Sequence, residues 1–147
     1  MRLFGLAGNM NPDQPWTSLK AAVAAKTFDS FSGTCYYFGE SLTDELGGDA
    51  APPIGLIHTA WGGSTIEQWL DNGTIGTCRN ATITPENGEY HATRILPFVD
   101  MAIKGWVWYQ GENDMGGVFG NSHRGYGYSC MMVCVTGVVA VNLGRCF

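Results

Sequence analysis

The chain has 147 residues, the size of one ordinary domain, and a chain of this length can bury roughly two thirds of its unfolded surface. It is 45% hydrophobic and 14% charged, a composition that excludes the intrinsically disordered class. Its net charge is −5, and its eight Lys and Arg residues form no stripe that could follow phosphates, so we expect no nucleic-acid partner.

The cysteines and the apolar runs limit which metal and membrane partners we expect. The five cysteines are an odd number without a C-x-x-C pair, which predicts at least one free thiol and no metal site. The first eight residues hold too short an apolar stretch for a signal peptide. The apolar run over 130–143 is shorter than the roughly 20 residues that span a bilayer, so we expect no membrane partner. Sequons at Asn72 and Asn80 would be glycosylated in a secretory compartment.

The first part of the chain predicts a strand, a helix and a second strand. Residues 2–7 have the character of a short strand. Apolar residues at helical spacing over 31–46 predict the clearest helix, with Ser30 or Ser32 as its cap and the following glycines as its stop. Residues 54–60 form a mostly apolar run that is too short for a helix. Such a run is typical of a strand covered on both faces of a parallel sheet.

A short helix and a polar excursion follow. Ser64 and Glu67 have the spacing of a capping box, so we expect Ser64 to cap a short helix that runs through Trp69. A nucleophilic role for Ser64 is the alternative, but the Gly-x-Ser-x-Gly pattern of a nucleophile elbow is not present around it. Residues 71–89 are rich in Asn, Thr and Gly and are expected to form a loop.

The last part predicts a bent helix, a strand and a divergent tail. Residues 90–103 have helical spacing that is bent or restarted at Pro97, and 106–109 are rich in the aromatic and β-branched residues of a central strand. A helix between two strands implies a right-handed βαβ crossover. The stretch 116–147 is dense in Gly and carries no acidic residue, so we expect a domain over 1–115 and a divergent tail over 116–147.

Two segments carry most of the functional information. Trp61–Glu67 and Trp108–Asn113 each follow a predicted strand and consist of glycine and polar residues. Because the carboxyl ends of parallel strands line the ligand crevice in open sheets, the two segments could meet at one site. This makes an active site the leading hypothesis.

Together with the helix over 31–46, the segments 53–69 and 104–113 closely resemble the sialate O-acetylesterases of the SGNH hydrolase superfamily. The resemblance covers residues 2–113. It implies a three-layer α/β fold of the flavodoxin-like type with a parallel sheet, of which this chain supplies a part. It also implies an esterase that removes acetyl groups from sialic acid or another acetylated sugar, with no cofactor, in a secretory, lysosomal or extracellular location.

The resemblance also assigns site residues. Acyl transfer places negative charge on one oxygen, and a backbone amide of Gly62 or Gly63 and the side-chain amide of Asn113 would donate hydrogen bonds to it. Neighbouring residues would hold the substrate: Gln110, Gly111 and Glu112. In this family a serine in a Gly-x-Ser-Asn motif is the nucleophile and a histidine in an Asp-x-x-His motif is the base. Neither motif occurs here, since His123 has Gly120 three residues before it.

We therefore expect an internal fragment that contains the oxyanion donors without the nucleophile and the base. A non-catalytic fragment or pseudoenzyme that binds acetylated glycans is the first alternative. A small cysteine-bearing interaction protein, whose tail pairs with another chain, is the second. Large residues in apolar surroundings are expected to be structural rather than catalytic or sugar-stacking: His58, Trp61, Trp69, Trp106 and Trp108.

Overall fold

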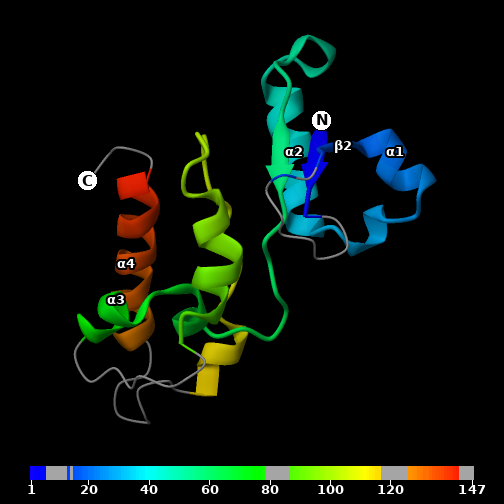
Figure 1. The fold of residues 1–147 in the computed structure, drawn as a ribbon. Coiled ribbons are helices and arrows are strands. Elements are labelled where there is room, and N and C mark those ends of the chain that lie inside the picture. Colours follow the sequence, from blue (N-terminus) through cyan, green and yellow to red (C-terminus); the bar gives the residue numbers. More distant parts are fainter. Residues whose placement is uncertain (6–12, 14, 79–86, 117–125, 143–147) are drawn as a thin grey trace. The chain divides into compact units, whose positions relative to one another are not determined.

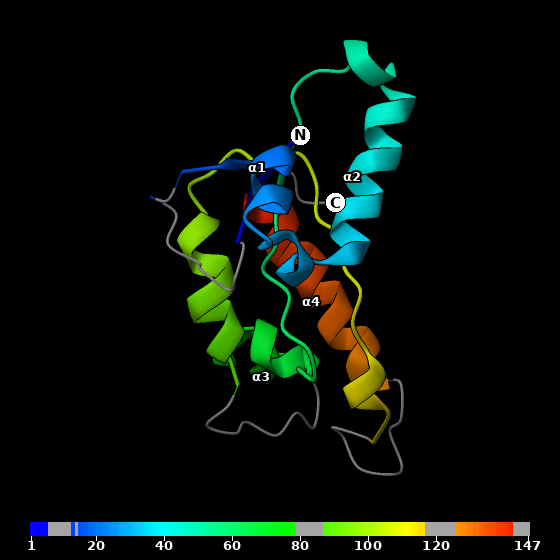
Figure 2. The same ribbon diagram turned by 90° about the vertical axis from the view of Figure 1, so that its right-hand side faces the viewer.

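The computed structural model describes residues 1–5, 13, 15–78, 87–116 and 126–142, and the structural statements below concern these residues. It shows a mixed α/β chain that divides into two compact units, Met1–Ala60 and Trp61–Phe147. Each unit is described by itself, and its elements are shown from two sides in Figure 1 and Figure 2.

Unit 1 contains a small three-stranded sheet. Its strands are β1 (Arg2–Phe4), β2 (Thr17–Ser18) and β3 (Gly55–Ile57). Their order is β2-β1-β3, with β1 antiparallel to β2 and parallel to β3. The strands expected within 2–7 and 54–60 are confirmed in place, although both are shorter, and the parallel pairing is confirmed for this one pair.

The described part of unit 1 also contains four helical elements: α1 (Leu19–Ala24), η2 (Phe28–Ser30), α2 (Gly33–Glu45) and η3 (Gly48–Ala50). The predicted helix is confirmed as α2, and of the two candidate caps Ser32 is the one used, since its Oγ accepts from the Cys35 amide at 3.3 Å. After α2, Gly47 adopts φ +108°, a left-handed conformation that suits glycine and ends the helix.

The core of unit 1 forms where α2 packs on β3. A Cβ at Gly39 of α2 would lie 2.6 Å from a methyl carbon of Leu56, so any larger residue would force the buried Leu56 side chain to move. Leu56 is buried together with Leu3, Ala22 and Phe31. The strand residue thus contributes its side chain directly to the unit's main apolar cluster.

Unit 2 is mostly helical in its described part. Its elements are η4 (Ile66–Trp69), α3 (Asn72–Gly76), η5 (His91–Ile95), η6 (Leu96–Phe98), η7 (Glu112–Gly116) and α4 (Tyr126–Asn142). The loop expected over 71–89 was wrong at its start, because α3 forms there. The Asp71 carboxylate accepts from the Thr74 amide at 2.9 Å and so caps this short helix.

The bent helix is confirmed in part. The chain forms a π-helix, η5, and then a 3-10 helix, η6, whose second residue is Pro97. The change of helix type at Leu96 is the restart that the proline predicted, because a proline ring is tolerated in the first turn of a new helix. The helical region ends at Phe98 rather than at Ile103.

The prediction of a second central strand over 106–109 was wrong. Residues 106–109 form neither helix nor strand, and the expected βαβ crossover is therefore not present in the described unit. A strand exists through hydrogen bonds to a neighbouring strand, and aromatic composition alone does not supply that neighbour. Instead, Trp106 and Trp108 pack against the buried cluster of Trp69, Tyr90 and Ile95.

The tail contains a defined helix. α4 packs on η4, and its Met131 and Val135 join Ile66, Leu70 and Ile75 in one buried cluster. A disulfide links Cys78, just after α3, to Cys130 of α4. The boundary expected after residue 115 stays a prediction. Within the described residues, no helix combines the length and apolar character needed to cross a bilayer.

Candidate functional site

The first segment of the candidate site is a glycine turn that leads into η4. Gly63 adopts φ +77°, which favours glycine, and both Gly62 and Gly63 are exposed. Neither backbone amide donates to an acceptor within the described residues. A side chain at either position would meet no atom within 4 Å, so the space above the turn is open. The two backbone amides of the turn are therefore unused donors within the described residues.

Hydrogen bonds tie this turn to the second segment. Gln110 donates from Nε2 to the backbone oxygen of Ser64 at 2.8 Å and to the carboxylate of Asp114. Asp114 also accepts from the backbone amide of Ile66 at 3.3 Å. The partners are 46 and 48 residues apart in the sequence. These bonds join the two segments, Trp61–Glu67 and Trp108–Asn113 with Asp114, into one local structure, the junction.

Asn113 completes the junction. Its side-chain amide donates to the backbone oxygen of Gly63, and both residues are exposed. A carboxamide nitrogen carries two hydrogens, and Gly63 takes one of them. The second N–H of Asn113 therefore lies beside the glycine turn as a further donor. The structure thus brings Gly63 and Asn113 together, with Gly62 adjacent in the chain, while their role as oxyanion donors stays a prediction.

The three residues expected to hold the substrate differ in their surroundings. Gln110 uses its side chain to link the segments, as described above. Gly111 adopts φ +141°, and a Cβ there would lie 3.4 Å from the Tyr128 hydroxyl oxygen. Glu112 is exposed. Substrate binding by these residues stays a prediction, and the contacts of Gln110 show in addition a structural role.

Tyr128 of α4 is a site residue that the sequence analysis missed. Its hydroxyl donates to the backbone oxygen of Gln110 at 2.8 Å, lies 3.0 Å from Gln110 Oε1, and accepts from Trp108 Nε1 at 3.2 Å. The hydroxyl therefore binds both Trp108 and Gln110 of the second segment. Its position in a glycine-rich stretch without acidic residues gave no sequence signal.

The capping role of Ser64 was wrong by one residue. The Thr65 amide donates to Gln68 Oε1 at 2.9 Å, so Thr65 is the residue before η4 and Gln68 reaches back to it. Ser64 Oγ instead donates to the Trp61 backbone oxygen at 3.0 Å and accepts from Trp69 Nε1 at 2.9 Å. No histidine is among its partners within the described residues, and this serine is held as a buried structural group.

Two acidic side chains, Glu67 and Asp114, belong to the two segments and are largely shielded from water. Glu67 is 4% exposed, and neither of its carboxylate oxygens has a hydrogen-bond partner within the described residues. Burial has the largest effect and raises the pKa of Glu67. Polar groups of its own backbone and of Thr65 lower this pKa, and the negative charge of Asp114 raises it. Burial also raises the pKa of Asp114, against the opposing effect of the bonds from Gln110 and Ile66. The charged form of Glu67 is thus disfavoured.

The aromatic residues divide into core and surface. Trp69 is 5% exposed, which confirms its core role, and Trp106 and Trp108 pack against the same cluster. Trp61 is 51% exposed, so its assignment to the core was wrong. The Arg94 guanidinium lies 4.5 Å from the Trp61 ring centre and covers it by a cation–π contact. An aromatic surface therefore stands next to the glycine turn.

His58 belongs to unit 1, where it follows β3. Its ring lies 5.3 Å from that of Phe31, with the two planes nearly perpendicular. This contact with a buried aromatic ring supports the structural interpretation of His58. His123 lies outside the described residues, and Cys146 does as well.

Comparisons with known proteins identify relatives of the chain. A family model described as carbohydrate esterase, sialic acid-specific acetylesterase, matches residues 8–122, which contain both segments of the junction. The human sialate O-acetylesterase is 33% identical over 98 residues, covering 60% of this chain and 18% of the relative. The rat sialate O-acetylesterase is 28% identical over 141 residues, covering 71% and 24%. No solved structure matches the chain. The chain spans about a fifth of the length of these curated relatives.

Proposed function

This chain belongs to the carbohydrate esterase family of sialic acid-specific acetylesterases, and from that premise we propose that it supplies the oxyanion-stabilising part of such an esterase. The substrate is an O-acetylated sialic acid or another sugar acetyl ester. The observation that carries the proposal is the bond from the Asn113 side-chain amide to Gly63, in a turn where the Gly62 and Gly63 amides have no acceptor within the described residues.

The chemistry of ester cleavage suits these donors. Attack on an acetyl carbonyl places charge on its oxygen, and fixed N–H groups aimed at that oxygen lower the barrier. Glycine lets a backbone amide approach the oxygen closely, and a carboxamide donates at any ordinary pH. The contacts of Asn113 with Gly63 and of Gln110 with Ser64 hold both donors in place before the substrate arrives. Removing one such donor typically costs about 10²–10³ in rate.

The sugar would lie beside the turn. Trp61 is 51% exposed and offers aromatic surface to a sugar ring, and Glu112 offers a carboxylate to sugar hydroxyls. In the complete protein the nucleophilic serine and the histidine base would come from residues outside this chain. We also propose that the small sheet of unit 1 is part of the three-layer flavodoxin-like fold that the family resemblance implies. The same resemblance implies a secretory, lysosomal or extracellular location of the protein.

A second candidate function is binding of acetylated glycans without catalysis. It is favoured by Ser64, whose hydroxyl is held by Trp61 and Trp69 rather than by a base. p-Nitrophenyl acetate tests the premise that both candidates share, namely that this chain does not cleave an ester by itself. A chain that lacks the nucleophile gives no burst and no saturable turnover, while saturable turnover abolished by Ser64→Ala would support a catalytic chain.

The donor role is tested with a methylphosphonate ester of a sugar, whose charged tetrahedral oxygen imitates the oxyanion. We expect calorimetry to show saturable binding that Asn113→Ala weakens about hundredfold, the low end of what losing an oxyanion donor costs. Asn72→Ala is the matched control, because Asn72 is an exposed asparagine of α3 in the same unit. Equal affinities of the two variants would overturn the donor role.

A further inference from the structure

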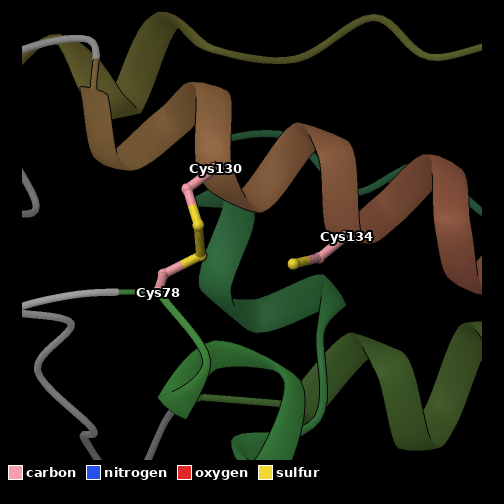
Figure 3. A group of neighbouring side chains, drawn as sticks. All are labelled: Cys78, Cys130 and Cys134. Carbon is pink, nitrogen blue, oxygen red and sulfur yellow. A yellow bond between two sulfur atoms is a disulfide. The ribbon is translucent and has the colours of Figure 1, made fainter.

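Three cysteines meet beside α4, and the proposed function uses none of them. Cys130 and Cys134 are four residues apart on α4 and therefore lie on the same face of the helix. Cys78 approaches them from the end of α3. Figure 3 shows the sulfur of Cys134 directed toward the disulfide between the other two. All three sulfur atoms lie within 4.8 Å of one another.

In the structure two of these sulfurs are joined to each other. A disulfide sulfur is a poor metal ligand, because metals bind the thiolate form of cysteine. Cys134 keeps a free thiol, and its sulfur lies 3.7 Å from the Thr77 hydroxyl oxygen. The capacity of the cluster to bind a metal therefore depends on whether the disulfide is closed or open.

We propose that, when the Cys78–Cys130 disulfide is reduced, the three cysteines bind one thiophilic divalent cation such as Zn²⁺. A phosphine opens the disulfide with one water molecule, giving two thiols and the phosphine oxide. The cation then displaces three protons and forms three metal–sulfur bonds. In the oxidised chain this site does not exist.

The geometry requires only small movements. Sulfurs bound to one tetrahedral Zn²⁺ at about 2.3 Å lie about 3.8 Å apart. The cluster starts with all sulfurs within 4.8 Å, so closing it around a cation draws Cys134 inward while the opened disulfide spreads. Two of the ligands stand on one rigid helix. With three protein ligands, a fourth position on the metal remains for water or an added ligand.

The surroundings favour a metal–thiolate bond. Cys78 is 3% exposed and belongs to the buried cluster of Ile66, Ile75, Met131 and Val135. Metal and thiolate attract each other more strongly in such an apolar environment than in water. The cation would also replace the covalent link between α3 and α4 that reduction removes.

This site departs from the sequence expectation of no metal. Cys78 and Cys130 are 52 residues apart, and the pair Cys130 and Cys134 has helical rather than C-x-x-C spacing. Cys130 and Cys134 also lie beyond residue 122, where the match to the family ends. The site is thus a feature of this chain that the family comparison does not provide, and it does not depend on the esterase function.

The test is a Cd²⁺ titration of the full chain, since Cd²⁺ binds thiolates as Zn²⁺ does and gives a sulfur-to-metal charge-transfer absorption. With a phosphine reductant we expect one Cd²⁺ per chain and the release of three protons per metal. Without reductant we expect no binding. Cys134→Ser is expected to weaken binding at least about tenfold, because it removes one of three ligands.

Cys35→Ser is the matched control, because Cys35 is a half-buried free thiol of unit 1 and lies outside the cluster. Its affinity for Cd²⁺ should equal that of the unchanged chain. If reduction simply unfolds the chain, the metal binds exposed thiols without distinction, and the two variants lose the same affinity. That result, or a reduced chain that binds no Cd²⁺, would overturn the proposal.

Discussion

Each of the two units is stabilised internally in a different way. Unit 1 relies on backbone pairing, in which β1 lies parallel to β3, and on close packing of Gly39 against Leu56. Unit 2 relies on side chains that are distant in sequence, such as Gln110 with Ser64 and the disulfide from Cys78. The candidate site therefore lies in unit 2, whose contacts are the harder ones to predict from a local sequence pattern.

The largest loss of stability is expected when the disulfide of unit 2 is removed. The disulfide closes a loop of 52 residues, and loss of its constraint on the unfolded chain costs about 4 kcal/mol. Cys78→Ser should therefore lower the unfolding midpoint in urea strongly, and Cys35→Ser only slightly. Similar midpoints for the two variants would show that unit 2 does not depend on this link.

The next largest loss of stability is expected from a substitution in the core of unit 1. Leu3 is fully buried, and Leu3→Ala should lower the free energy of unfolding by about 3 kcal/mol, since the side chain leaves a cavity. Val23, which is 55% exposed, is the control, and Val23→Ala should change it by less than about 0.5 kcal/mol. Trp16 is the tryptophan of unit 1, so in a Trp16→Phe background the fluorescence reports unit 2, and we expect unit 2 to keep its own transition when Leu3→Ala is added. A single shared transition would contradict separate units.

A smaller effect is expected at the junction. Asp114 accepts from the Ile66 amide and from Gln110, and Asp114→Ala leaves the Ile66 amide without its partner at a cost of about 2 kcal/mol. Glu112→Ala changes an exposed carboxylate two residues away and should have almost no effect on urea unfolding. If both variants are equally stable, the side-chain bonds of Asp114 do not hold the two segments together.

The smallest effect is one of pH dependence. The folded-state pKa of Glu67 is raised above its ordinary value of 4.5, mainly by burial, so folding favours the protonated acid. The stability that this carboxyl contributes is fully present below pH 4.5 and is lost as the pH rises through the raised pKa. Relative to Glu67→Gln, the unchanged chain should therefore become less stable between pH 4 and pH 7. A stability difference that is constant with pH would contradict a buried, unpartnered carboxyl.

The sequence predicted what depends on neighbouring residues. The cap at Ser32, the stop at Gly47 and the restart at Pro97 each follow from the conformation of one or two residues. The strand at β3 was found because an apolar run between turns is itself a local signal.

The sequence did not predict what depends on distant partners. The strand at 106–109 lacked a neighbouring strand in the described unit, and Ser64 found partners in Trp61 and Trp69 that replaced the expected cap. Tyr128 reaches Gln110 only because α4 packs on η4. Of the candidate site, the meeting of the two segments was predicted correctly, but the bonds that hold them were not.

The most direct test of the account follows the donors themselves by NMR, in a titration of the ¹⁵N-labelled chain with the sugar methylphosphonate. The account predicts that the backbone amides of Gly62 and Gly63 and the side-chain amide of Asn113 shift together and saturate with one dissociation constant. Shifts of the glycine amides without Asn113, or no saturable shift at any of the three, would contradict a shared oxyanion site.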